Sequence, residues 1–411
     1  MYRVEGPARL KVVEGSFYAL GRVYSSGCEL VVPRGITVCL KVEGGCTLEG
    51  VGSVSEAKPE EEVIDEWRAI AESIATRGRV VVVGETDSGK TTFSTYLINV
   101  ALSRGLSVAL IDADVGQNDV GWPGTIALAF PERPISWLGE LDPAAFYFVG
   151  ANSPMGHEDA VILGVSKLLK RAEGRDLVVV NTDGWVADKR ALAYKCRLVE
   201  SIEPTTLVVM RGSGAADPIA RIFEGTRVNV VRAPTPPAAR GKVRELRKMR
   251  RELSYLDLLA KSSVKSVSLD RVKLWASYTF NGQPDEGLSA TLSALLGFSV
   301  FAETCGSAVV VSALCGEEYK RLLELKEQLS KLVNRDVMVT CLSALKGYLV
   351  GLVNASLEHV GVGVLEEVDP RRRVIKIRTP FEVEGARLLI VGRLRLSESG
   401  AERERGPPPL A

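Results

Sequence analysis

Residues 84–92, with the sequence GETDSGKTT, have the types and spacing of a phosphate-binding loop. Gly84 is followed after four residues by Gly89, Lys90 and Thr91, which is the pattern G-x-x-x-x-G-K-T. Glycines let the backbone turn tightly so that its N–H groups point at phosphate. A helix that begins near Lys90 would add the positive end of its dipole. We expect this loop to bind a nucleoside triphosphate through nine residues: Gly84, Glu85, Thr86, Asp87, Ser88, Gly89, Lys90, Thr91 and Thr92.

Two residues of the loop have specific expected roles. Lys90 would reach the β- and γ-phosphates, and the Thr91 hydroxyl would bind Mg²⁺ or another divalent metal. The four valines at 80–83 predict a buried parallel strand before the loop. A glycine turn without a ligand is disfavoured, because the strand, the loop and a helical pattern occur in the required order.

Asp112 and Asp114 end the next apolar run, SVALIDAD. Side chains two residues apart in an extended backbone point the same way, so both carboxylates can face the phosphates. One could hold a metal-bound water, and the other could take a proton from an attacking hydroxyl. We assign the metal to Asp112 and the proton to Asp114; the alternative for either is to cap a loop.

The surrounding pattern predicts an α/β fold. Strand-like and helix-like segments alternate from residue 80 to residue 234, which indicates a parallel sheet covered by helices on both faces. Ligands of such sheets lie beyond the carboxyl ends of the strands. Before this core, short β-branched runs separated by turn signals predict an all-β domain. After it, the pattern is mixed and mostly β.

We therefore predict three domains and a tail. The N-terminal β domain covers 1–58, and the phosphate-loop domain covers 59–260 with an arginine-rich lid at 240–251. A C-terminal, mostly β domain covers 261–398. The polar, proline-rich residues 399–411 are expected to be flexible.

Composition excludes several classes of function. The 411 residues carry 52 Lys and Arg against 51 Asp and Glu, so a nucleic-acid site must be a local patch. Seven scattered cysteines indicate reduced thiols and an intracellular protein, cytoplasmic or nuclear. Two histidines make a zinc site or a Ser/His/Asp hydrolase a poor hypothesis. The sequence opens without a signal peptide and shows no apolar run long enough to span a membrane.

Later motifs make the chain resemble the polynucleotide 5′-hydroxyl kinase family, in its archaeal form. This family includes the RNA kinase subunit of mRNA cleavage factor and kinases of ribosomal RNA processing. The resemblance rests on the phosphate loop, on the DADVGQ at 112–117, on the WPGT at 122–125, on the TDGW at 182–185 and on the arginine-rich segment. It covers the chain in outline, but its motifs lie within 80–255.

The resemblance implies an enzyme that transfers the γ-phosphate of ATP to the 5′-hydroxyl of RNA, or of DNA. It implies that Lys90 and Asp114 act in catalysis together with lid arginines. Five arginines compete for that role; we favour Arg240 and Arg244, with Arg247 next. It also implies RNA contacts from Gln117, Pro123, Gly124, Thr125, Thr182, Gly184 and Trp185. RNA-processing proteins are the partners it suggests.

Trp185 has an independent reason to bind RNA, because its flat face could stack on a base of any sequence. Two other functions stay open from the residues alone. One is a phosphate-loop ATPase or assembly factor of RNA processing without kinase activity. The other is an RNA-binding scaffold in which the outer β domains act.

Overall fold

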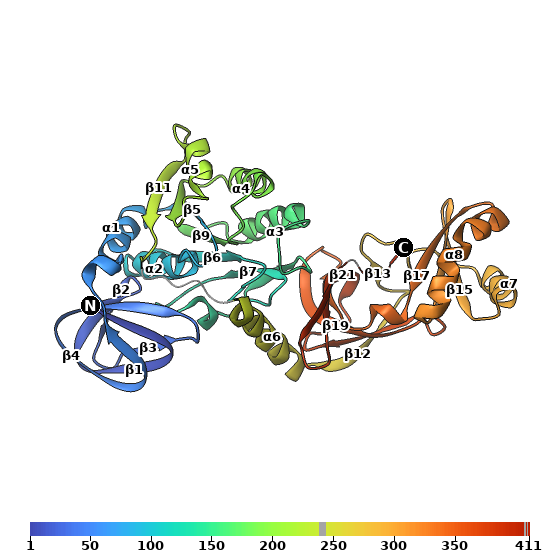
Figure 1. The fold of residues 1–411 in the computed structure, drawn as a ribbon, viewed down its shortest axis with the longest axis horizontal. Helices are drawn as coiled ribbons and strands as arrows, with labels where there is room; N and C mark the ends of the chain where they lie inside the picture. Colours follow the sequence, from blue (N-terminus) through green and yellow to red (C-terminus); the bar gives the residue numbers. More distant parts are fainter. Residues whose placement is uncertain (238–243, 407, 409) are drawn as a thin grey trace. The chain divides into compact units, whose positions relative to one another are not determined.

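The structure is a computed structural model that describes residues 1–237, 244–406, 408, 410 and 411. Within these residues the chain forms two compact units, Met1–Arg251 and Glu252–Ala411. Figure 1 labels their elements. Helix α6 (Arg244–Ala260) contains the position at which the first unit ends.

The first unit begins with a four-stranded antiparallel sheet. Its strands are β1 (Tyr2–Ala19), β2 (Arg22–Ser25), β3 (Glu29–Val32) and β4 (Thr37–Glu56). Strand β1 pairs with the other three, and Tyr2 is opposite both Leu40 and Glu56, so the two halves of β4 flank one end of β1. Alternate side chains build a separate apolar core that includes Val4, Phe17 and Leu30.

The strand–helix core follows this sheet. Its helices are η1 (Pro59–Glu61), α1 (Ile64–Ile74), α2 (Lys90–Ser103), η2 (Leu138–Glu140), α3 (Glu158–Arg171), α4 (Lys189–Ile202) and α5 (Asp217–Phe223). Its strands are β5 (Gly78–Val83), β6 (Val108–Ala113), β7 (Thr125–Ala129), β8 (Ala145–Phe148), β9 (Leu177–Thr182), β10 (Thr206–Arg211) and β11 (Asn229–Pro234). In the first unit, these strands lie in the order β11-β10-β5-β9-β6-β7-β8.

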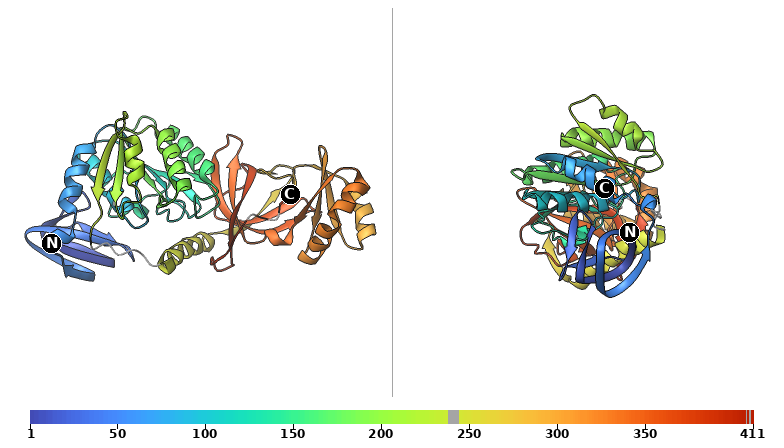
Figure 2. Two further views of the ribbon diagram at one scale, coloured as in Figure 1. Left: turned by 45° about the horizontal axis from the view of Figure 1, so that its top comes forward. Right: turned by 90° about the vertical axis from the view of Figure 1, so that its left-hand side faces the viewer.

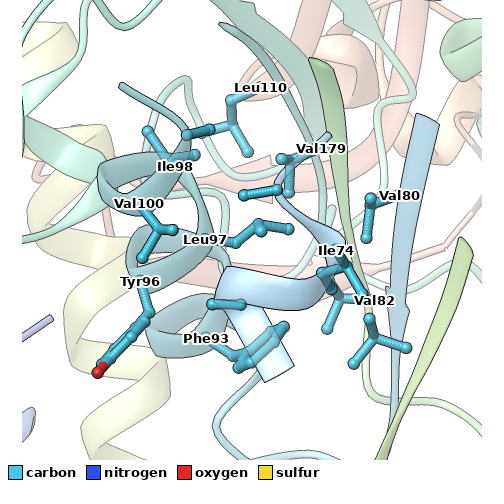
Figure 3. Close-up of a cluster of buried hydrophobic side chains, with 14 of the residues drawn as sticks. Ile74, Val80, Val82, Phe93, Tyr96, Leu97, Ile98, Val100, Leu110 and Val179 are labelled. Carbon is cyan, nitrogen blue, oxygen red and sulfur yellow. The ribbon is translucent and has the colours of Figure 1, made fainter. Parts of the chain in front are cut away.

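Apolar side chains cover both faces of this sheet, as the valine runs predict. Val80 and Val82 face a cluster with Phe93 and Leu97 of α2, which Figure 3 shows. Val81 and Val83 face the opposite cluster, which contains residues of α3, α4 and α5. The predicted fold class is confirmed: a central phosphate-loop α/β domain follows an all-β domain and precedes a mixed, mostly β part.

The sheet differs from the prediction at one edge. A parallel sheet is predicted, but β7 and β8 follow Asp114, and both pairings at this edge are antiparallel. Gly124, with φ of +85°, sits in the turn that leads into β7. Five apolar or small residues carry too little alternation to indicate a strand, whereas burial between β6 and β8 creates one.

The N-terminal sheet is joined to the core within the first unit. Asn99 of α2 donates hydrogen bonds to the carbonyls of Leu20 and Ile135, at 2.7 and 2.8 Å. Lys41 pairs with Asp65 of α1 at 2.6 Å. Figures 1 and 2 show the dark-blue strands beside the light-blue helix α1.

The second unit contains two sheets. One has the order β14-β15-β16-β17 and packs on α7 (Glu286–Leu296) and α8 (Gly316–Val333). Its strands are β14 (Gln283–Pro284), β15 (Val300–Cys305), β16 (Ala308–Ala313) and β17 (Asp336–Cys341). The other runs β12-β20-β19-β18-β21, with β13 and β22 beside β21. Its elements are β12 (Ser263–Ser268), β13 (Lys273–Leu274), β18 (Tyr348–Asn354), β19 (His359–Asp369), β20 (Val374–Thr379), β21 (Ala386–Leu396) and β22 (Glu402–Arg405), with η3 (Ser343–Leu345) before β18.

The C-terminal residues are more ordered than predicted. Residues 402–405 of the expected flexible tail form β22, which pairs with β21. The main-chain N–H of Tyr278 donates to the carbonyl of Ala411 at 2.7 Å. Backbone pairing therefore holds part of this polar segment in place. Among the helices of the described ranges, we find none long and apolar enough to cross a membrane.

Candidate functional site

The phosphate loop (residues 84–92) connects β5 to α2 as predicted. Gly89 has φ of +93°, which favours glycine, and stands immediately before the first residue of the helix, Lys90. The Lys90 side chain is 5% exposed, and its ammonium donates to the Glu85 carbonyl at 2.7 Å. Burial lowers the pKa of Lys90 to about 8, although the Asp114 carboxylate acts in the opposite direction. The ammonium thus lies within the curve of the loop.

Not every side chain of the loop points toward its interior. The Glu85 carboxylate accepts hydrogen bonds from the N–H groups of Ser213 and Ala215, at 2.8 and 3.2 Å, so it anchors the segment after β10. The buried Ser88 hydroxyl has no hydrogen-bond partner in the part of the chain that the structure describes. The Glu85 side chain thus binds the segment after β10, whereas the Ser88 hydroxyl remains available for a hydrogen bond to a nucleotide.

Asp112 lies at the end of β6, fully buried, opposite Asn181 of β9. Its carboxylate accepts from the Asn181 side-chain amide at 3.0 Å and from the Asp119 N–H at 2.9 Å. Burial, and then the nearby carboxylates of Asp119 and Asp114, raise the pKa of Asp112 to about 8. A bound cation would lower that pKa again.

The residues around Asp112 fit a hard divalent cation. The amide nitrogen of Asn181 is 3.3 Å from the Thr91 hydroxyl and 3.0 Å from Asp112, so Asn181 bridges the two predicted metal residues. The buried Asn181 Oδ1 has no partner among the described residues. Outside the gaps at 238–243, 407 and 409, no cluster of three or more His, Cys, Asp or Glu could hold a metal. Mg²⁺ in phosphoryl-transfer sites is commonly bound through one or two carboxylates together with substrate phosphates.

Asp114 directly follows the last residue of β6. Its carboxylate accepts from the N–H groups of Gly116 and Gln117, at 3.1 and 3.0 Å. Burial raises the pKa of the Asp114 carboxyl, and the Lys90 ammonium opposes that rise. A carboxylate with a raised pKa is a better proton acceptor than an exposed one.

A cavity of about 600 Å³ opens beside the phosphate loop. The loop forms one wall, and residues 35–39 of the N-terminal sheet form another. Asp114, Gln117 and Asp119 line the cavity at the end of β6, and Trp67 of α1 lines it too. The N-terminal wall carries no motif that the sequence could have revealed.

Two arginines of α6 complete the cavity. Arg247 pairs with Asp87 of the phosphate loop at 3.5 Å, and Arg250 pairs with Asp119 at 2.6 Å. The Gln117 amide donates to the Arg247 carbonyl at 3.3 Å. Of the two favoured lid arginines, Arg240 lies outside the described residues, and Arg244 begins α6 with its side chain undescribed. The lid positions that the structure brings to the site are Arg247, our third choice, and Arg250.

The TDGW motif ends β9 and enters the loop to α4, residues 183–188, called the β9–α4 loop. Thr182 is fully buried and donates to the Val82 carbonyl at 2.9 Å. The hydroxyl thus joins β9 to β5, and the contact of Thr182 with RNA stays a prediction. A side chain at Gly184 would place its Cβ 2.4 Å from Thr86 Oγ1 and 2.5 Å from Thr86 N. Glycine is needed there because this loop touches the phosphate loop.

Trp185 is partly exposed beside this contact. Its ring stacks on Tyr194 of α4 with centroids 5.8 Å apart and planes 26° apart. Its indole N–H donates to Asp188 at 2.6 Å. Neither Trp185 nor the rest of the TDGW motif lines the cavity described above.

The WPGT segment has a structural role. Pro123, Gly124 and Thr125 are buried, and the Thr125 hydroxyl donates to the Trp122 carbonyl at 2.6 Å. The Gly124 carbonyl accepts from the N–H groups of Val149 and Gly150, both at 2.9 Å. These three residues lie where the chain turns into β7, and their RNA contacts stay a prediction.

Sequence reasoning missed three residues at the same sheet edge: Asn181, Asp183 and Lys195. Asn181 and Asp183 flank Thr182 and are polar residues that end an apolar strand, which is a signal of a ligand site in parallel sheets. Lys195 shares a helix face with Ala191, Leu198 and Ile202, all buried. A lysine at an apolar position of a helix is the signal that could have revealed it.

These features define a phosphate-loop nucleotide-binding protein with paired carboxylates and an arginine-bearing helix at its cavity. Comparison with known proteins shows what this core resembles. Residues 84–260 match the family described as "mRNA cleavage and polyadenylation factor CLP1 P-loop". The predicted resemblance is confirmed.

Curated relatives extend the match beyond the core. A polyribonucleotide 5′-hydroxyl-kinase of Thermococcus kodakarensis is 29% identical over 354 residues, which cover 85% of this chain and 97% of the relative. A protein of the same name from Methanocaldococcus jannaschii is 26% identical over 79% of this chain and 88% of the relative. A protein CLP1 homolog of Anopheles gambiae is 28% identical over 52% of this chain and 57% of the relative.

One solved structure supports the fold over nearly the full length. It is titled a wild-type Clp1p–Pcf11p complex, and it matches with a TM-score of 0.62. The match covers 96% of this chain and 95% of that chain at 12% identity. At this identity the likeness concerns the arrangement of elements.

Proposed function

We propose that this protein is an ATP-dependent polynucleotide kinase that phosphorylates the 5′-hydroxyl end of RNA. The observation that carries the proposal is the meeting of three segments at one sheet edge. The phosphate loop follows β5, the carboxylate pair ends β6, and TDGW ends β9, which lies between them. The relatives named polyribonucleotide 5′-hydroxyl-kinase support the same reaction.

The phosphate loop would bind the triphosphate of ATP. Its N–H groups and the first turn of α2 meet the phosphates, and Lys90 leaves the Glu85 carbonyl to reach the β- and γ-phosphates. Residues 35–39 also line this cavity and would contact the rest of the nucleotide.

Asp114 would accept the proton of the attacking hydroxyl. The 5′-oxygen forms a bond to the γ-phosphorus, the bond from that phosphorus to the β–γ bridging oxygen breaks, and ADP leaves. The proton of the 5′-hydroxyl passes to Asp114 Oδ, which burial prepares to hold it. Lys90 and the Arg247 guanidinium, next to Asp87, would neutralise charge on the transferred group.

Thr91 and Asp112 would hold Mg²⁺ or another divalent metal. Bound there with the phosphates, the metal would supply charge neutralisation for phosphoryl transfer. Asn181 and Asp119 hold the Asp112 carboxylate in place by their hydrogen bonds.

Trp185 would stack on the terminal base of the acceptor, and Gln117 would contact its backbone. Such stacking is insensitive to sequence, which suits an enzyme that reads an end. The proposal also includes DNA as a possible acceptor and RNA-processing proteins as partners. It includes an intracellular location, with which the free state of all seven cysteines agrees.

The test is a transfer assay with γ-labelled ATP, Mg²⁺ and an RNA oligonucleotide that ends in a 5′-hydroxyl. We expect label on the oligonucleotide, and an oligonucleotide with a 5′-phosphate is the matched control that should stay unlabelled. Released phosphate without labelled oligonucleotide would instead support an ATPase or assembly factor. Neither product, with oligonucleotide bound, would support a scaffold.

A further inference from the structure

A buried ion pair lies at the base of the β9–α4 loop, and the reaction described above does not use it. Lys195 has no exposed area, and Asp183 is 3% exposed. The Lys195 ammonium is 2.7 Å from the Asp183 carboxylate and also donates to the Asp183 main-chain carbonyl at 2.9 Å. Burying two charges is a costly way to gain stability, since apolar residues of similar volume often serve as well.

The Asp183 carboxylate organises the loop around it. One oxygen accepts the Trp185 main-chain N–H at 2.9 Å, and the other accepts the Tyr194 hydroxyl at 2.9 Å. Tyr194 is itself the ring on which the Trp185 indole stacks. The carboxylate therefore links the backbone of Trp185 to the residue that supports its side chain.

Helix α4 and its N-cap residue Asp188 thus hold Asp183 and Trp185 at three points. Lys195 binds both the carboxylate and the carbonyl of Asp183, Tyr194 lies against the indole, and Asp188 accepts the indole N–H at 2.6 Å. Asp188 also accepts from the first N–H groups of α4, so the helix start and the indole share one carboxylate. All of these residues belong to the first compact unit.

We infer that Lys195 is a positioning residue for the acceptor: through Asp183 it fixes the β9–α4 loop so that Trp185 presents its ring to the terminal nucleotide. The inference deepens the proposed function and rests on it for the identity of the acceptor. Lys195 contacts Asp183 and does not line the cavity beside the phosphate loop. Its removal should therefore affect oligonucleotide binding far more than nucleotide binding.

The test compares Lys195→Met with Arg197→Met, which removes the same charge from an exposed position on the same helix. Fluorescence anisotropy measures binding of a labelled 5′-hydroxyl RNA oligonucleotide, and a non-hydrolysable ATP analogue measures the donor site. We expect Lys195→Met to weaken oligonucleotide affinity about tenfold, within the range for one lost base stack. Analogue affinity should change less than about twofold, and Arg197→Met should change neither. Equal losses for both ligands, or no loss, would overturn the inference.

A second comparison separates action through Trp185 from general damage. In a Trp185→Ala background, Lys195→Met should add less than about twofold to the loss of oligonucleotide affinity, because residues acting through one contact are not additive. Full additivity of the two losses would show that Lys195 acts elsewhere.

The single variant leaves Asp183 buried without its partner, so it can fail to fold. Asp183→Asn combined with Lys195→Met removes both charges and keeps the volumes. This double variant should fold and still lose oligonucleotide affinity about tenfold, because the ammonium anchor is gone. Affinity equal to that of the wild type would refute the inference. A wild type that binds RNA but transfers no phosphate would refute the kinase function alone, since these measurements need no catalysis.

Discussion

Lys90 is held inside the phosphate loop before any ligand arrives. Its ammonium donates to the Glu85 carbonyl, and little of the side chain is exposed. A phosphate oxygen can replace that carbonyl with a short movement, so the cost of ordering a flexible lysine has been met during folding. In the proposed reaction, Lys90 would therefore contribute a fixed charge at the point where negative charge develops.

Lys90→Met should reduce transfer at least about 10²-fold, because one preorganised donor to a transferred group is worth this much or more. The side chain keeps its length, so the unfolding temperature should stay near that of the wild type. Label transfer and thermal unfolding followed by circular dichroism measure the two quantities. Near-normal transfer by a folded variant would contradict the role of the loop in binding the phosphates of ATP.

Trp185→Ala should raise the KM for the oligonucleotide about 5- to 100-fold, since base–aromatic stacking contributes about 1–3 kcal/mol per base. The KM for ATP should stay within about twofold, because the tryptophan lies outside the cavity beside the phosphate loop. Trp185→Phe keeps a flat ring and should lose less. If ATP and oligonucleotide are affected equally, the stacking role is wrong.

Helix α6 shows why a basic segment is difficult to interpret before its helical phase is known. Five arginines between 240 and 251 compete for the lid role in the sequence. In the structure Arg247 and Arg250 are three residues apart and so share one face of the helix. That face meets Asp87 and Asp119.

Arg247→Met should lower kcat about 10²-fold or more, as expected for an arginine that neutralises a transferred phosphoryl group. Arg250→Met should have a smaller effect, because Arg250 pairs with Asp119, away from the loop. Lys248→Met, on an exposed position of the same helix, is the matched control and should leave kcat unchanged. The ordering is contradicted if Lys248→Met costs as much as Arg247→Met in steady-state kinetics.

The elements whose patterns are strong follow the predictions closely. The run at 80–83 predicts β5, and the helix expected to begin near Lys90 corresponds to α2. Burial decides the rest. Strand β7 has no alternation of polar and apolar residues, so its sequence does not predict a strand. The sequence of WPGT does not show that residues 123–125 are buried in the folded chain. Strand register places Asn181 beside Asp112, and helix packing buries Lys195. Neither placement can be deduced from the type of the residue alone.

Gly184→Ala should lower kcat/KM for both substrates, because its Cβ overlaps Thr86 and forces the two loops apart. Overpacking of this kind costs about 1–3 kcal/mol of unfolding free energy, which denaturant unfolding would measure. Gly45→Ala is the control, since a Cβ there meets no atom within 4 Å. A Gly184→Ala enzyme with unchanged kinetics would contradict the close contact.

At the scale of the whole molecule, charge is balanced, with a formal net charge of +1. Long-range steering of RNA by a basic field is therefore weak, and affinity must come from contacts at the site. Stacking and a few cations suit an enzyme that holds a strand end and ignores the remaining sequence.

Binding of the oligonucleotide should consequently depend weakly on salt. If about two phosphates are neutralised, log K should fall against log salt with a slope of about −1.4, from the relation for single strands. Anisotropy titrations over a series of KCl concentrations measure this slope. A slope steeper than about −4 would reveal an extended basic surface instead.

The contact between Gly184 and Thr86 has a consequence for how the two substrates communicate. The loop that would hold ATP and the loop that would hold RNA touch through backbone atoms, so neither can shift alone. Occupancy of one should change the affinity of the other, and thermodynamic linkage requires the two changes to be equal factors. The contact between the two loops would then set the distance between the γ-phosphate and the 5′-hydroxyl. Any preferred order of substrate binding would result from this coupling, and not from one substrate blocking access for the other.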